Sequence, residues 1–181
     1  SGLVGSEMCI RDSYCDLRDA DLEGARLHFT VLTGANLEGI DLSGRELEMM
    51  LFNKANMAGA KLDGLIAERC DFSQADLHDA TFVRANLKHV VFSKANMEGA
   101  VLDRTMLHGV DLGSVDFRKL TMKAVSFYAC LFQNCDFVDV DLSGHDFSCC
   151  TFNGSNMQRV NMRETVLDMA TMKEVDLQHA E

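Results

Sequence analysis

Residues 75–99 read A-D-L-H-D A-T-F-V-R A-N-L-K-H V-V-F-S-K A-N-M-E-G, five pentapeptides that each hold a large apolar residue at the third place. We call that residue the centre, and the register continues from Cys15 to His179. Of the 33 centres from Leu17 to Leu177, 32 are Leu, Phe or Met, and Ala67 is the exception. Two places before the centre, 27 of the 33 residues are Ala, Val, Ser, Thr or Cys. A fixed period of this length indicates a repeat architecture.

Neither a helix nor a plain strand explains a period of five, because their periods of 3.6 and 2 would spread the centres over every face. The backbone must therefore take an extended step and then turn a corner. Glycine tolerates the positive φ that tight turns require. Ten of the eleven glycines after residue 13 lie two places after a centre, as Gly34 and Gly99 do. These glycines predict one corner in every pentapeptide.

A slower period of twenty residues divides the pentapeptides into four classes, which we name sides one to four after the centres Leu17, Leu22, Leu27 and Leu32. Asp or Asn precedes the centre in all nine members of side one, against 8 of 24 elsewhere. Side four holds five of the ten phenylalanine centres. Four sides per coil predict a rod of about eight coils, roughly 40 Å long if parallel ladders stack at ~4.8 Å.

The pentapeptides A-N-L-E-G (35–39), A-D-L-H-D (75–79), A-N-M-E-G (95–99) and C-D-F-V-D (135–139) resemble the A-[DN]-L-x-x motif of the pentapeptide-repeat family. The resemblance covers residues 15–179. It implies an all-β fold, a right-handed quadrilateral parallel β-helix with the centres and small residues inside. Some members of the family that protect type II topoisomerases from quinolones are held to imitate DNA, so the resemblance also implies such an enzyme as one candidate partner.

Residues 1–13 break the register, because Glu7 and Asp12 stand where centres would fall. The run L-V-G-S-E-M-C-I-R-D (3–12) looks like a translated sequencing adapter. We therefore expect residues 1–13 to be non-native and residues 14–181 to form a single β-helix domain. A native N-terminal segment is the alternative, and caps or domains could be missing at both ends of the chain.

The composition favours an uninterrupted rod with reduced thiols. Proline is absent, so every backbone N–H can join a ladder, and no apolar run approaches the length of a membrane span. Five of the seven cysteines fall at inward positions as small apolar residues, whereas Cys149 should face outward. Cys130 and Cys150 stack one coil apart, near enough for a disulfide, but free thiols in a cytoplasmic protein are the favoured interpretation.

No pattern in the sequence predicts catalysis, a metal site or a cofactor. The six histidines fall on different sides or distant coils, and the serines and glycines lack the context of a nucleophile or a phosphate loop. Arg45 and His145 replace small inward residues. We expect each to mark a local irregularity where its side chain escapes toward solvent or a corner. A rod filled by its centres leaves no pocket, so we expect a protein that is not an enzyme.

Charge is distributed unevenly around the rod, within a net charge of −11 for the chain. Side one carries 10 acidic and 4 basic residues, whereas side four is neutral. DNA presents one charge per ~1.7 Å, far more than this side offers. Corner hydrogen bonding and solubility are therefore favoured over DNA mimicry as the reason for the acids. The candidate acidic face consists of Asp16, Asp19, Glu38, Asp76, Asp79, Glu98, Asp116, Asp136, Asp139 and Asp176.

A second candidate surface is apolar and lies along one corner of the first coils. Its residues should all face outward, and Phe29 is the one phenylalanine of the chain that is not a centre. Contiguous exposed apolar groups usually mark a contact. A partner site, a self-association site and the footprint of a missing cap are all open interpretations. The candidate apolar patch consists of Phe29, Val31, Met49, Leu51 and Ile66.

Three hypotheses of function follow from the sequence. The first is a cytoplasmic bacterial rod that binds a protein partner, without direct contact to nucleic acid or membrane, and that could self-associate end to end or as a homodimer. The second is an acidic DNA mimic that binds DNA gyrase or topoisomerase IV. The third is the repeat domain of a larger secreted effector or scaffold.

Overall fold

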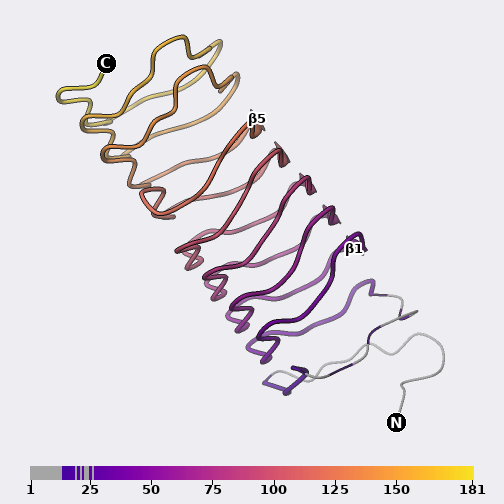
Figure 1. Cartoon of the computed structure of the whole chain (residues 1–181). Helices are drawn as coiled ribbons and strands as arrows, with labels where there is room; N and C mark the ends of the chain where they lie inside the picture. The colour runs from indigo at the N-terminus through magenta and orange to yellow at the C-terminus, as the bar shows by residue number, and fades with distance from the viewer. Residues whose placement is uncertain (1–13, 19, 21, 23–24, 26) are drawn as a thin grey trace.

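The computed structural model describes residues 14–18, 20, 22, 25 and 27–181, so the expectation for residues 1–13 lies outside the described residues. Figure 1 shows a rod built of stacked coils. Parallel backbone bridges join residues twenty apart, from Asp16↔Asn36 to Asn156↔Asp176. The predicted all-β, four-sided parallel β-helix is therefore confirmed, and eight steps of twenty residues separate Asp16 from Asp176.

Side three carries the regular strands of the described chain. They are β1 (Glu46–Glu48), β2 (Ile66–Glu68), β3 (Asn86–Lys88), β4 (Met106–His108) and β5 (Ser126–Tyr128). The five strands form one parallel sheet in the order β1-β2-β3-β4-β5, with pairs such as Leu47↔Ala67 one coil apart. The other sides contribute isolated bridges with the same spacing. Within the described residues, no helix is long and apolar enough to cross a membrane.

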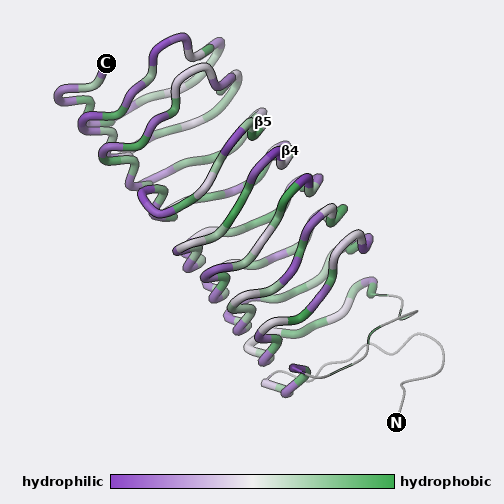
Figure 2. The backbone as a smooth tube through the Cα atoms, in the orientation of Figure 1, coloured by the Kyte–Doolittle hydropathy of each residue, from purple (hydrophilic) through white to green (hydrophobic). Residues whose placement is uncertain are grey.

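The interior is a stack of layers in which each centre lies on the centre one coil earlier. Between Leu27 and Met157 every centre is buried except Met122. On side four, the Phe52 ring stacks on Phe72 at 4.8 Å and Phe72 stacks on Phe92 at 5.3 Å. Ring pairs of this kind add about 0.5–1.5 kcal/mol each beyond the burial of their area. Figure 2 shows the resulting short alternation of apolar and polar residues along each coil.

The predicted corners are present two places after the centres. Nine described glycines there have positive φ, between 61° and 74°. A Cβ atom at Gly99 would collide with the Asp79 carboxylate, so this corner requires glycine in its present surroundings. Other residues also adopt the left-handed corner, including Lys54 at φ 60°. The corner is thus imposed by the ladder, and glycine lowers its conformational cost where it occurs.

Two polar residues at the small inward position, Thr105 and Arg45, turn toward the preceding coil. Thr105 Oγ1 donates to the carbonyl oxygen of Phe82 at 2.7 Å, and the Arg45 guanidinium donates to that of Leu22. Each acceptor belongs to the centre 23 residues earlier. The expectation that Arg45 escapes toward solvent or a corner is therefore wrong, because its charged group finds a backbone acceptor inside the stack.

Cys70, Cys130, Cys135, Cys149 and Cys150 are free thiols. Cys70, Cys130, Cys135 and Cys150 are buried, and Cys15 and Cys149 are half-buried. Burial raises the pKa of Cys70 to about 11 and that of Cys135 to about 12. Because the thiolate is the reactive form, these two thiols act as core residues and not as nucleophiles.

We expect Phe92→Asp to unfold the rod, because a carboxylate would be buried beside the rings of Phe72 and Phe82, which lie 5.3 and 5.6 Å away. The cost should exceed about 3 kcal/mol. Thermal unfolding followed by circular dichroism measures it, with the exposed Lys94→Asp as the matched control. A Phe92→Asp variant that melted like the parent would contradict the inward orientation of the centres.

Candidate interaction surfaces

The Asp and Asn residues of side one form the corner hydrogen bonds of that side. The Oδ1 atom of Asp116 accepts the backbone N–H of Arg118 at 3.0 Å, and Asp176 accepts that of Gln178 at 3.1 Å. The same contact recurs at all nine positions from Asp16 to Asp176. Corner hydrogen bonding is therefore sufficient to explain why Asp or Asn occupies every one of these positions.

Most of the candidate acidic face is paired with cations. Arg118 contacts Asp116 at 2.6 Å and Asp136 at 3.3 Å. Further ion pairs join Asp16 to Arg18, Asp76 to His78, Glu98 to Lys119 and Asp139 to Arg159. Exposed pairs of this kind contribute little to stability, but they reduce the net charge that a partner would meet.

Among the described residues of this face, Glu38, Asp79 and Asp176 have no cationic side chain within 4.0 Å. Asp176 accepts a hydrogen bond from the Gln158 amide at 2.6 Å instead. Asp19 lies outside the described residues. The structure thus brings the other nine acids onto one side, as the twenty-residue period predicts, but as a partly neutralised row.

Arg118 also holds its partner in the ionised form. The hydrogen bond from the Arg118 side chain lowers the pKa of Asp116 from its ordinary 3.8. A lowered carboxyl pKa stabilises the fold above the unfolded-state pKa, and the contribution is lost as the pH falls through the folded-state value. The pair therefore stabilises the rod at neutral pH and fails in acid.

The candidate apolar patch is on the surface where the sequence places it. Phe29, Ile66 and Leu51 are 59%, 47% and 38% exposed, and Val31 and Met49 are half-buried. Phe29 and Met49 both have a corner φ of 52°, a conformation that bulky residues rarely adopt. Phe29 thus combines an exposed ring with an unfavourable backbone.

The structure extends this patch along the rod, which the sequence reasoning missed. Met106, Tyr128 and Leu131 are 52%, 47% and 36% exposed on the same side or its adjoining corner. The signal was present, because Met106 lies forty residues after Ile66, at the same position of the twenty-residue period. We call the combined surface the apolar strip. It consists of Phe29, Leu51, Ile66, Met106, Tyr128 and Leu131.

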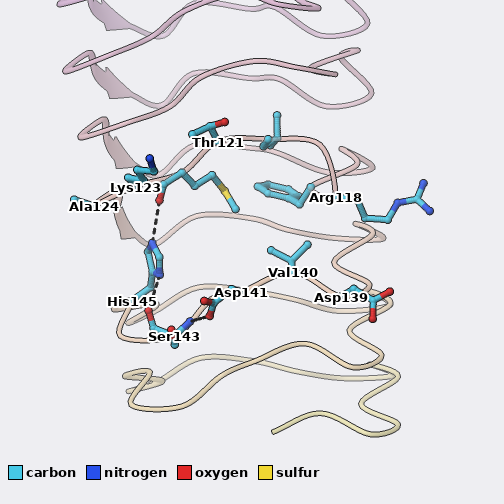
Figure 3. A pocket seen from close by; sticks show the side chains of 12 residues that line it. Arg118, Thr121, Lys123, Ala124, Asp139, Val140, Asp141, Ser143 and His145 are labelled. Carbon is cyan, nitrogen blue, oxygen red and sulfur yellow. Dashed lines mark hydrogen bonds between the residues drawn. The ribbon is translucent and has the colours of Figure 1, made fainter.

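A cleft of about 430 Å³ interrupts side two between residues 120–124 and residues 139–145 (Figure 3). The coils also stand visibly farther apart after β5 than between β1 and β5 in Figure 1. The prediction that the rod contains no pocket is therefore wrong at this step. We call this cleft the side-two slot.

The backbone ladder is open at the slot. In the preceding step the Thr121 N–H donates to Ala100, the Leu102 N–H to Thr121 and the Arg104 N–H to Lys123, at 2.7–3.0 Å. At the slot, one coil further along the chain, the donors equivalent to Thr121, Leu102 and Arg104 are the N–H groups of Asp141, Met122 and Ala124. Among the described residues, none of these three donates to the backbone of the facing coil.

Two oversized inward residues account for the opening. Leu120 and His145 both occupy positions that small residues hold in most coils. The His145 imidazole lies between the coils, with Nε2 3.3 Å from the Met122 oxygen and Nδ1 3.1 Å from the Leu142 oxygen. The ring and its contacts with carbonyl oxygens of both coils thus occupy space that a single ladder hydrogen bond spans elsewhere. Overpacking of this kind displaces the backbone.

His145 therefore marks an irregularity, as the sequence predicts, but its side chain bridges two coils and does not escape to solvent (Figure 3). The displacement also exposes the interior locally. Leu120, Met122 and Val140 are half-buried, whereas the neighbouring centres Leu102 and Leu142 are each 1% exposed. The slot consequently has an apolar floor and polar backbone walls.

Within the part of the chain that the structure describes, no three His, Cys, Asp or Glu residues are grouped so that they could hold a metal ion. The surfaces above are therefore surfaces for contact, and their chemistry is that of hydrogen bonds, ion pairs and apolar area.

A pentapeptide period folded into four-sided parallel coils defines the class of pentapeptide-repeat β-solenoids. The family model described as "Pentapeptide repeats" matches the chain in eight copies, over residues 13–44, 55–93, 80–118, 126–163 and 146–181. The chain belongs to this family.

Solved structures share the fold at low sequence identity. A trypsin-treated variant of QnrB1, a plasmid-mediated fluoroquinolone resistance protein, is similar with a TM-score of 0.57 and 15% identity, over 86% of this chain and 90% of that chain. A second trypsin-treated QnrB1 variant has a TM-score of 0.54 and 19% identity, over 85% and 80% of the two chains. No curated protein sequence matches the chain. These likenesses establish the fold alone.

We expect His145→Val to close the slot, because Val125 holds the same inward position one coil earlier and is buried. Three recovered ladder hydrogen bonds, less the one that a neutral imidazole can donate, should stabilise the rod by about 1–3 kcal/mol. Urea unfolding measures the gain, and hydrogen exchange should show new protection at Met122, Ala124 and Asp141. Arg45→Val, which removes an oversized inward residue far from the slot, is the control and should leave those three amides unchanged.

We expect Arg118→Ala to return the pKa of Asp116 toward its ordinary value, since the first cause of the lowering is the Arg118 side chain. In the parent, the free energy of unfolding falls as the pH falls through the lowered pKa, because this stabilisation is lost. The variant should lack this contribution. NMR titration of the Asp116 carboxyl carbon measures the shift. Arg163→Ala, which removes the distant pair with Glu181, should not move it.

Proposed function

We propose that this protein is a rigid, non-enzymatic rod that binds another protein through its outer surface. The observation that carries the proposal is the apolar strip, since several large apolar side chains exposed along one face usually mark a contact surface. The strip lies over the regular sheet β1–β5 and its adjoining corner, where coil is bonded to coil. A partner would therefore meet a preformed surface and would not have to order it.

The rod also sets the spacing of the contact groups. Ile66 and Met106 occupy the same position two coils apart, which places them ~10 Å from each other along the axis. Between them lies Asn86, which is half-buried and polar. A complementary partner needs two apolar pockets at this separation, and a flexible surface could not maintain it.

A second candidate function is DNA mimicry toward a type II topoisomerase, which the exposed acids of side one favour. The ion pairs of Asp16, Asp116, Asp136, Asp139 and Glu98 argue against it, since the cations cancel charge that a DNA mimic would present. A DNA gyrase supercoiling assay tests the idea. Altered supercoiling or quinolone sensitivity at micromolar protein or below would support DNA mimicry, and a folded rod without effect would exclude it.

The third hypothesis, a repeat domain within a larger effector or scaffold, depends on sequence outside this chain. A cytoplasmic setting is part of our proposal, because Cys130 and Cys150 are free thiols although they are adjacent in the stack. The complete gene would test both points, since further domains would support the scaffold and a secretion signal would oppose the cytoplasm.

We expect the double variant Ile66→Asp/Met106→Asp to lose binding to protein ligands selected on the parent from displayed bacterial protein fragments. Two carboxylates would face the pockets that held apolar groups, so binding should weaken at least tenfold. The matched control is Glu38→Lys/Asp79→Lys on the acidic face, which should retain binding. The reverse pattern would assign the contact to the acidic face and contradict the proposal.

A further inference from the structure

We propose that the side-two slot binds one extended peptide segment of a partner protein, which pairs with the open backbone edges as an additional strand. This inference rests on the proposed function as an interaction rod, and it assigns a second site with a different ligand chemistry. The slot lies on side two, whereas the apolar strip lies on side three and its corner.

The first support is the hydrogen-bonding capacity of the two walls. One wall presents the N–H groups of Met122 and Ala124, and the other presents the N–H of Asp141, none of which has a backbone partner on the facing coil. Of the carbonyl groups that these donors would meet in a regular step, those of Leu120 and Asp141 accept no backbone hydrogen bond among the described residues, whereas that of Ser143 lies 3.2 Å from His145 Nδ1. Unpaired strand edges are templates for a further strand, and extended peptides use them in β-augmentation.

The second support is that His145 contacts only one of the ladder groups. Its Nε2 atom approaches the carbonyl oxygen of Met122, which the regular ladder does not use, and its Nδ1 atom lies 3.2 Å from the ladder carbonyl oxygen of Ser143. The imidazole thus separates the walls and makes no contact with the N–H groups of Met122, Ala124 and Asp141.

The third support is the floor of the slot. Leu120, Met122 and Val140 are partly exposed there, so one apolar side chain of an extended peptide would be covered on entry. The volume of about 430 Å³ is within the ~300–1,000 Å³ range of ligand pockets. The walls supply affinity for any backbone, and the floor selects an apolar residue.

The charge at the mouth of the slot selects the neighbouring residue. Arg118 and Asp139 both line the slot, but each is engaged in an ion pair, and the Asp141 carboxylate accepts hydrogen bonds from the Ser143 N–H and the Asn161 amide. Lys123 has no carboxylate within 4.0 Å among the described residues. Its side chain therefore favours an acidic residue beside the apolar one. The predicted ligand is an extended segment with an apolar–acidic pair.

The preceding coil supplies a probe with this pattern. Residues 98–106, E-G-A-V-L-D-R-T-M, contain Leu102 followed by Asp103, and the Asp103 carboxylate accepts the Lys123 N–H at 2.9 Å in the rod. A fluorescein-labelled synthetic peptide of this sequence should bind the full chain with a Kd on the order of 100 µM in fluorescence anisotropy. Hydrogen exchange should show protection of Met122, Ala124 and Asp141 when the peptide is bound.

Two comparisons locate the binding. The same peptide with N-methylated backbone at alternate residues should bind at least tenfold more weakly, because it cannot pair with the walls. His145→Val, which closes the slot, should weaken binding at least tenfold, whereas Arg45→Val should not. Peptide binding that survives His145→Val or N-methylation, or the absence of saturable binding to the parent, would overturn the proposal.

These outcomes are separate from those of the proposed function. The Ile66→Asp/Met106→Asp variant alters the apolar strip and should bind the probe peptide as the parent does. If the peptide does not bind the slot, the apolar strip still stands as the proposed contact surface. If the strip does not bind a partner, the slot still stands as the proposed peptide site.

Discussion

The backbone ladder between coils limits the volume of the side chains that can face inward in each coil. The ladder brings successive coils to ~4.8 Å, so every inward side chain must fit within a layer of that thickness. Stacked rings meet this limit, as Phe52 and Phe72 do at 4.8 Å. Leu65 and Ala67 show a permitted exchange, since the large residue has moved to the small position and both remain buried. Leu120 and His145 add volume beside a full-sized Met122, and there the ladder opens.

The same constraint explains which parts of the structure the sequence predicts. Each inward residue meets its equivalent one coil away, so a count of five and twenty assigns the sides, the corners and the outward positions without further information. Ile66 and Phe29 were placed correctly for this reason. Met106 and Tyr128 follow from the same count, although the candidate apolar patch that the sequence predicts ends at Ile66.

The slot and the ion pairs were beyond prediction for a different reason. The sequence marks His145 as a misfit, but whether a misfit bends outward or separates the coils depends on its neighbours, here Leu120 and the free carbonyl group of Met122. Arg45 is a misfit of similar size that binds the Leu22 oxygen, and its ladder to the following coil is complete. Likewise, Arg118 can reach carboxylates two and eighteen residues away, and geometry decides that it contacts both.

An open edge inside a solenoid differs physically from an open edge at its end. A strand added at an end exposes a new edge, so addition can continue and lead to aggregation. In the slot, both walls are already part of stacked coils: the coil of Leu102 bonds to Thr121 and Lys123, and Leu142 bonds to Asn161. A strand that enters is therefore closed on both sides, and no further strand can follow. The misfit at His145 thus creates a site for one segment in a fold that otherwise presents only side chains to a partner.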